Sequence, residues 1–187
     1  MFKIIQLALL TYSLSLLPTI GNATCKPESI PPSTPSSQFT DNGDGTVTDT
    51  KTDLIWKKCS EGQVENDCSG GSRQRYNWEA ALERVQTINA TGGFAGYTDW
   101  RVPNIKELAS IVEQQCEFPA VNWVVFPNTH SGEFWSASPA RGNGELVWGV
   151  DFRYGTVEWA FLSRNWSPKN DQHYVRLVRS GSHVDGQ

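Results

Sequence analysis

Gly-Tyr-Thr-Asp-Trp-Arg-Val-Pro-Asn-Ile-Lys-Glu-Leu, residues 96–108, is the stretch that decides the fold of this 187-residue chain. Its second half has the start of a helix, because Asn104 can cap the first turn and Glu107 completes a capping box. We expect Pro119 to end this helix. Its buried stripe is predicted to be Ile105, Leu108, Ile111 and Val112.

The residues before this stretch predict another helix. Asn77 can cap it, and Gly92 with Gly93 should end it. Trp78 belongs to its apolar stripe, so we expect this tryptophan to pack in the core rather than to bind a ligand. The whole stripe, at helical spacing, is Trp78, Ala81, Leu82, Val85 and Ile88.

Strand patterns lie on both sides of the two helices. Residues 46–48 and 54–56 follow a dense turn signal at 41–45 and predict a hairpin or meander. Apolar residues alternate over 146–152 and again over 157–161, with Tyr154-Gly155 as a tight turn between them. Residues 174–178 predict a last strand, with Val175 and Leu177 on one face and Arg176 on the other. This order predicts an α+β domain with small antiparallel sheets.

The Asp/Asn/Gly loop at residues 41–45 also resembles a calcium loop. The full EF-hand spacing fails, however, since position 12 counted from Asp41 is Thr52 rather than a glutamate. We therefore interpret the loop as turn chemistry, and we expect neither a metal nor a cofactor.

Residues 1–23 have the features of a secretory signal peptide. Lys3 precedes an uncharged apolar run at 4–17, and small residues at Gly21 and Ala23 favour cleavage before Thr24. The run is short for a permanent membrane anchor, which is the alternative interpretation. A lipid anchor on Cys25 is disfavoured, because residues 22–24 do not resemble a lipobox. We expect an exported protein, in the periplasm or at the cell surface, with no stable membrane span after cleavage.

The exported part divides into three segments. Residues 24–38 are rich in proline and serine and predict a flexible linker, because they offer little apolar surface to bury. Residues 39–180 are expected to form the globular domain, and residues 181–187 a disordered tail.

Four cysteines lie beyond the expected cut, and an even number in an oxidising compartment predicts two disulfides. Four cysteines allow three pairings. We favour Cys59 with Cys68, since they flank a short polar loop, which leaves Cys25 with Cys116. No Cys-x-x-Cys is present, so redox and zinc motifs lack support.

Charge is distributed unevenly over a formal total of −4. Residues 39–140 hold 8 basic and 14 acidic residues, whereas residues 141–179 hold 6 basic and 4 acidic residues. This disfavours a general polyanion-binding surface but allows a local basic patch in the C-terminal third. No motif supports nucleic-acid binding.

Several blocks, in this order, resemble the Lcl C-terminal domain family, a former domain of unknown function found in a bacterial collagen-like adhesin. They are residues 41–49, 54–56, 96–108, 126–129, 134–138 and 175–179. The resemblance spans about residues 39–179. It implies a C-type-lectin-like fold, in which two helices flank a small sheet and the N- and C-terminal strands meet. For the adhesin it implies binding of sulfated glycosaminoglycans, although the present chain has no Gly-x-y repeat.

Catalytic patterns are weak. His130, His173 and His183 have no ligand spacing, and no Gly-x-Ser-x-Gly elbow is present. Asp99 and Arg101 are interpreted as pairing or capping turns around a buried tryptophan. Formylglycine-generating enzymes share a related fold, but this chain lacks a cysteine pair late in the sequence. We therefore expect a protein that is not an enzyme.

The candidate ligand residues follow Trp135, because tryptophan and tyrosine rings stack on sugars while arginine and asparagine bind hydroxyl or sulfate groups. We expect recognition of a glycan or other extracellular ligand by these C-terminal loops. A structural or assembly protein that binds an envelope or host-surface partner is the first alternative, and an enzyme of unknown class the second. The candidate residues are Arg141, Asn143, Arg153, Tyr154, Trp159, Arg164, Asn165 and Trp166.

Overall fold

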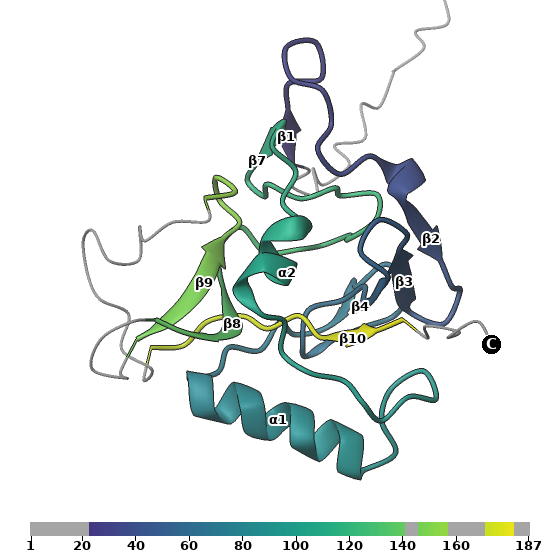
Figure 1. Ribbon diagram of the computed structural model, residues 1–187, viewed down its shortest axis with the longest axis vertical. Coiled ribbons are helices and arrows are strands. Elements are labelled where there is room, and N and C mark those ends of the chain that lie inside the picture. Colours follow the sequence, from purple (N-terminus) through teal and green to yellow (C-terminus); the bar gives the residue numbers. More distant parts are fainter. Residues whose placement is uncertain (1–22, 141–145, 157–170, 182–187) are drawn as a thin grey trace, which may run out of the picture.

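The computed structural model describes residues 23–140, 146–156 and 171–181. Within these ranges the chain forms two α-helices and four small antiparallel sheets (Figure 1). The predicted α+β class is confirmed, and so are both expected disulfides, Cys25–Cys116 and Cys59–Cys68.

The largest sheet joins the first strands of the domain to its last described strand. Its strand order is β10-β4-β3-β2 and all neighbours are antiparallel. Val178 lies opposite Trp56, and Trp56 lies opposite Val47. The N- and C-terminal strands therefore meet, as the resemblance implied. The strands are β2 (Phe39–Asp41), β3 (Thr46–Asp49), β4 (Leu54–Lys57) and β10 (Val178–Ser180).

The turn between β2 and β3 is stabilised by hydrogen bonds from backbone amides to its own acidic side chains. Asp41 Oδ1 accepts from the Gly43 amide at 3.0 Å, and Asp44 Oδ1 accepts from the Thr46 amide at 3.0 Å. The other Asp41 oxygen pairs with Lys58 Nζ at 2.7 Å. Hydrogen bonds from Lys58 and Gly43 hold the pKa of Asp41 below its usual value.

Both predicted helices are present. Helix α1 (Trp78–Ala90) is capped by Asn77, whose side chain accepts from the Ala80 amide. Helix α2 (Ile105–Ser110) begins with the expected capping box of Asn104 and Glu107. The expectation that α2 continues to Pro119 is wrong, because the backbone leaves the helix at Ile111 and Val112 then bridges to Val121. Ile111 and Val112 are buried nevertheless.

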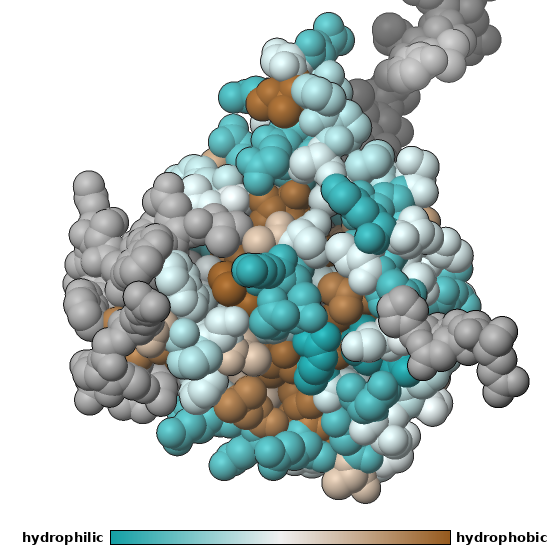
Figure 2. Space-filling model, in the orientation of Figure 1, coloured by the Kyte–Doolittle hydropathy of each residue, from teal (hydrophilic) through white to brown (hydrophobic). Residues whose placement is uncertain are grey.

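Two apolar clusters form the core. The first contains Trp56, Phe126 and Phe134 and lies between the largest sheet, α2 and the pair of β8 (Glu133–Pro139) with β9 (Val147–Asp151). The second packs the buried face of α1 against Trp100 and Trp135. On the face shown in Figure 2, apolar residues gather between α2 and α1 and polar residues surround them.

The last third follows the predicted pattern only in part. Strand β9 and the turn after it are confirmed, but Trp148 is half-buried while its neighbours are buried. The strand predicted at 157–161 lies outside the described residues. The final strand is β10 rather than residues 174–178. The backbone carbonyls of Tyr174, Val175 and Leu177 accept hydrogen bonds from amides at different places in the chain, so residues 174–177 do not pair with one neighbouring strand. Arg176 is fully buried and donates to the carbonyls of residues 57 and 58.

Residues 24–38 are part of the domain, which corrects the flexible-linker prediction. Strand β1 (Thr24–Cys25) pairs with β7 (Cys116–Glu117), and the disulfide closes this pair. A turn of 3-10 helix, η1 (Ser36–Gln38), leads into β2. Between them, the buried carboxylate of Glu113 accepts hydrogen bonds from the amides and hydroxyls of Ser33 and Thr34.

Candidate functional site

Only two of the eight predicted ligand residues lie within the described structure. Arg153 and Tyr154 follow β9 and are both exposed. The other six lie outside the described residues; they are Arg141, Asn143, Trp159, Arg164, Asn165 and Trp166.

Tyr154 pairs with a second exposed aromatic ring that the sequence did not indicate. Tyr154 is 58% exposed and Phe118 is 45% exposed, and their ring centroids lie 5.0 Å apart in an edge-to-face arrangement. The Phe118 amide donates to the Arg153 carbonyl at 2.9 Å, which joins the segment after β7 to the turn after β9. Two aromatic rings are therefore presented together to solvent.

The turn that carries Tyr154 is fixed by a glycine. Gly155 has φ +68°, and a Cβ there would lie 2.6 Å from Val112 Cγ1 and 3.0 Å from Ala120 Cβ. The Gly155 amide also donates to the Asp151 carbonyl at 3.0 Å. Glycine is required because the turn packs directly against the core.

Arg153 is held in place by two carboxylates. Its Nε lies 2.8 Å from Asp151 Oδ2, and its Nη2 lies 3.0 Å from Glu133 Oε1. The hydrogen bond with Asp151 raises the pKa of Arg153 above its usual value. Glu133 Oε2 lies 2.9 Å from His173 Nδ1, so this network ties β8 and β9 to the segment before β10.

A second group of side chains, Tyr174, His130 and Arg73, lies next to this network. Tyr174 follows His173, and its ring centroid lies 4.5 Å from that of His130. His130 Nδ1 lies 3.1 Å from Arg73 Nη1. Burial, together with the charges of Arg73, Arg75 and Arg153, holds the pKa of His130 below its usual value. A neutral imidazole that accepts from Arg73 through Nδ1 fits this environment. His173 itself is buried. We call the exposed and partly exposed members of this group the aromatic surface: Phe118, Arg153, Tyr154, Glu133, Tyr174, His130 and Arg73.

The aromatic surface ends at an open pocket of about 470 Å³, here called the disulfide-loop pocket. It lies beside the loop closed by Cys59–Cys68 and the short pair of β5 (Gln63–Val64) with β6 (Gly70–Gly71). Its size is within the range of small-molecule sites. The lining residues are Gln63, Cys68, Ser69, Gly71, Ser72, Arg73, Asn128 and Tyr174.

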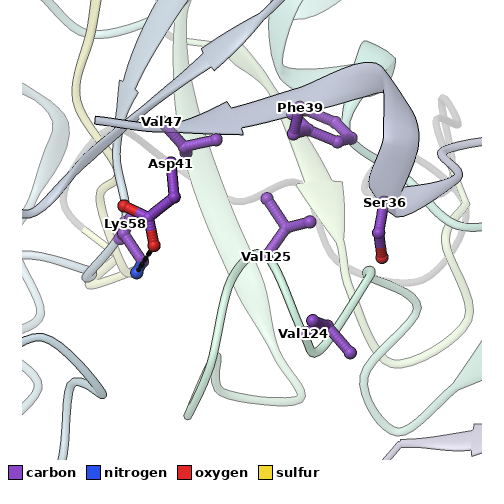
Figure 3. Close-up of a pocket in the computed structure, with 7 residues that line it drawn as sticks. All are labelled: Ser36, Phe39, Asp41, Val47, Lys58, Val124 and Val125. Atoms are coloured by element: carbon purple, nitrogen blue, oxygen red, sulfur yellow. Dashed lines mark hydrogen bonds and ion pairs between the residues drawn. The ribbon is translucent and has the colours of Figure 1, made fainter. Parts of the chain in front are cut away.

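A smaller pocket of about 160 Å³ lies beside β2 (Figure 3). Phe39, Val47 and Val125 give it apolar walls, and the Asp41–Lys58 ion pair lies at one side. Val124 at its edge is 79% exposed. This pocket has room for one apolar side chain but few groups that could orient a polar ligand.

The residues that could suggest catalysis are used in structural contacts. Asp99 pairs with Arg179 at 2.7 Å, and Arg101 forms a fork with Glu107 at 2.6 and 2.7 Å. Trp100 between them is buried, which confirms the structural interpretation of this segment. In the parts of the chain that are described, no group of three potential metal-ligating side chains lies together.

Sequence reasoning missed most of the aromatic surface. Phe118, Arg73 and His130 precede the C-terminal third, where the aromatic and basic residues predict the ligand site. The Arg-x-Arg at 73–75 is the one local signal that could have pointed to the pocket. Phe118, Arg73 and His130 come close to Tyr154 and Tyr174 only through tertiary contacts, which a single sequence does not specify.

Comparison with family models matches residues 45–179 to the Lcl C-terminal domain. No curated protein matches the chain. The two disulfides together include all four cysteines. This indicates a domain outside the reducing cytoplasm. None of the helices in the described ranges has the length and apolarity to cross a membrane.

Proposed function

Because the chain belongs to the Lcl C-terminal domain family, we propose that it is an exported, non-catalytic binding module that recognises a glycan through the aromatic surface. The apolar leader at residues 4–17 and the two disulfides support export to the periplasm or surface of a bacterium.

The exposed pair of Phe118 and Tyr154 is the observation that carries this proposal. Sugar rings stack their C–H faces on aromatic rings, and Phe118, edge-to-face with Tyr154 at 5.0 Å, offers a ligand a second apolar ring to contact. Arg153 lies beside the pair and is fixed by two carboxylates that offset its charge, so it can donate to a hydroxyl group without losing much side-chain entropy.

A non-catalytic role agrees with the way the carboxylates of this surface are used. Asp151 and Glu133 are both paired with Arg153, so each carboxylate already has a cationic partner within the protein. The polar groups of the surface are thus arranged to hold a ligand.

A glycan array that includes heparin tests the proposal, followed by titration of the best ligand. Replacing Phe118 and Tyr154 together by alanine should weaken binding about tenfold or more, equivalent to about 1.4 kcal/mol. Tyr97→Ala is the matched control, because Tyr97 is another partly exposed tyrosine and stacks on Arg179 instead. Absence of any glycan binding, or equal affinity in the double variant, would contradict the proposal.

The predicted residues outside the described structure need their own variant. If the C-terminal loops contribute, Arg164→Ala with Trp166→Ala should also weaken binding of the same glycan. Unchanged binding in that variant would restrict recognition to the aromatic surface.

Binding of an envelope protein during assembly is the second candidate function. The observation that favours it is Val124, which is 79% exposed at the edge of the small apolar pocket. A stoichiometric partner that is not displaced by sugars, is lost in Val124→Glu and is kept in Tyr154→Ala would support this role. A partner captured equally by Val124→Glu would contradict it.

A further inference from the structure

The two disulfides of this domain differ in how far solvent reaches them. Cys25 is exposed, like its neighbour Thr24 in β1, whereas its partner Cys116 is 7% exposed. In the other disulfide, Cys59 is 5% exposed and Cys68 is 1% exposed. Thiol–disulfide exchange requires a thiolate to reach one sulfur of the bond. The first disulfide therefore offers a point of attack that the second does not offer.

The segment that carries Cys25 has few other contacts with the domain. Residues 24–33 are all exposed, and none of them belongs to either apolar cluster of the core. Two sets of hydrogen bonds join residues 24–32 to other described parts of the chain. They are the bonds of the β1–β7 pair and one from the Lys26 amide to the Gln115 carbonyl at 2.8 Å. A segment with so few buried contacts opens locally at little cost in free energy once its covalent link is cut.

The residues that follow this segment are held without a cysteine. Glu113 Oε1 accepts from the Ser33 amide at 2.9 Å, and Glu113 Oε2 accepts from the Thr34 amide at 2.8 Å. On the side of β7, the Phe118 amide donates to the Arg153 carbonyl at 2.9 Å. Because these contacts do not depend on the disulfide, we expect the domain from Ser33 onward to stay folded when the bond is reduced.

Buried contacts surround the other disulfide. Gln63 Nε2 donates to the Cys68 carbonyl at 2.8 Å, and the fully buried Arg176 donates to the carbonyl of Lys58, the residue before Cys59. A thiolate can reach these sulfurs only after the loop and its buried contacts open, and such an opening is costly in free energy. The fold therefore protects this disulfide from reduction.

We propose that Cys25–Cys116 is a reducible disulfide, which an external dithiol opens selectively to free residues 24–32 while Cys59–Cys68 stays closed. One thiolate of the dithiol attacks Cys25 Sγ, the bond between the two sulfurs breaks, and Cys116 leaves as a thiolate. The second thiolate of the dithiol then attacks the mixed disulfide and releases Cys25. Two electrons and two protons pass to the protein, and the dithiol becomes a disulfide. Glycan binding plays no part in this reaction.

Timed reduction of the folded, full-length chain with dithiothreitol tests the selectivity. At each time, free thiols are blocked with N-ethylmaleimide, and the labelled cysteines are located by peptide mass spectrometry. Cys25 and Cys116 should be labelled faster than Cys59 and Cys68 by about tenfold or more. The control is the same reaction in urea, where the fold no longer covers either disulfide and the difference should disappear. Equal rates in the folded chain, or a difference that persists in urea, would overturn the proposal.

Amide hydrogen exchange on the selectively reduced protein tests the release of the segment. The Lys26 amide should exchange faster by about tenfold or more, because its acceptor on Gln115 is no longer held beside it. The Thr34 and Phe118 amides should keep their protection. Cys25→Ser with Cys116→Ser should give the same pattern without reductant. Unchanged exchange at Lys26 would mean that the segment stays docked, and faster exchange at all three amides would mean general unfolding. Either result in the reduced wild type would overturn the proposal.

Discussion

Replacing Glu113 by glutamine should release the N-terminal segment from the domain. The Glu113 side chain is 2% exposed, and its two oxygens accept from the Ser33 amide and hydroxyl, the Thr34 amide and hydroxyl, and the Gln115 amide. Burial alone would raise the pKa of Glu113, but the backbone hydrogen bonds from Ser33 and Thr34 outweigh it and hold the pKa below its usual value.

The expected size follows from these contacts. In glutamine, one carboxylate oxygen becomes an NH₂ group, so at least one backbone amide faces another donor and the remaining hydrogen bonds lose their charged acceptor. Each hydrogen bond to a charged group contributes about 1.5–3 kcal/mol, so the free energy of unfolding should fall by about 3–5 kcal/mol. With a urea m-value on the order of 2 kcal/mol/M, the midpoint should fall by about 1.5–2.5 M.

The assay is urea unfolding combined with amide hydrogen exchange. Exchange at Ser33 and Thr34 should accelerate most, since one of their amides loses its acceptor and the other loses a charged acceptor. Glu83→Gln is the control, because Glu83 is exposed on α1 and makes no ion pair among the described residues. A lowered folded pKa means that this stability is present at neutral pH and is lost as the pH falls through that pKa, so the variant should lose less stability in acid than the wild type. A Glu113→Gln protein within about 0.5 kcal/mol of the control would refute the reasoning.

Three further changes have defined outcomes. Replacing Cys59 and Cys68 by serine should lower the free energy of unfolding by about 2–3 kcal/mol, measured in urea, and a loss below about 1 kcal/mol would show that the loop gains little from closure. Gly155→Ala should destabilise by about 1–3 kcal/mol and weaken glycan binding by moving Tyr154; unchanged binding would contradict the role of the turn. The pKa of His130 is lowered from 6.5, so the unfolded chain binds a proton first and stability should fall as the pH drops below about 6.5. His130→Phe should lose less stability than the wild type between about pH 7 and about pH 5, and equal losses would contradict this.

The helices could be predicted because their signals are local. Asn77, Asn104 and Glu107 specify the helix starts within a few residues, and the structure uses each of them as expected. The end of α2 could not be predicted in the same way. Ile111 and Val112 continue the apolar stripe of the helix, and the contact that replaces the helix is a bridge between Val112 and Val121.

The N-terminal segment was mispredicted because its partner is distant in sequence. Composition alone shows few apolar side chains in residues 24–38. Ser33 and Thr34 are ordered instead by Glu113, about 80 residues later, and by the Cys25–Cys116 disulfide. Polar docking onto a buried carboxylate leaves no periodic pattern to detect.

The candidate site was predictable only where it coincides with a turn. Tyr154 lies beside Gly155 in a recognisable tight turn, so its exposure followed from the sequence. Phe118, Arg73 and His130 come from three other segments that only the folded chain brings together. The sequence therefore predicted the kinds of residue in the site, aromatic and basic, better than it predicted which positions form the aromatic surface.

Mapping backbone amide shifts while a glycan is titrated tests the central claim most directly. The best-binding oligosaccharide of the array should shift the amides of Phe118, Arg153, Tyr154, His130 and Tyr174 together, with one dissociation constant. Shifts centred on Val124 and the small apolar pocket, or no shifts at saturating oligosaccharide, would contradict recognition by the aromatic surface.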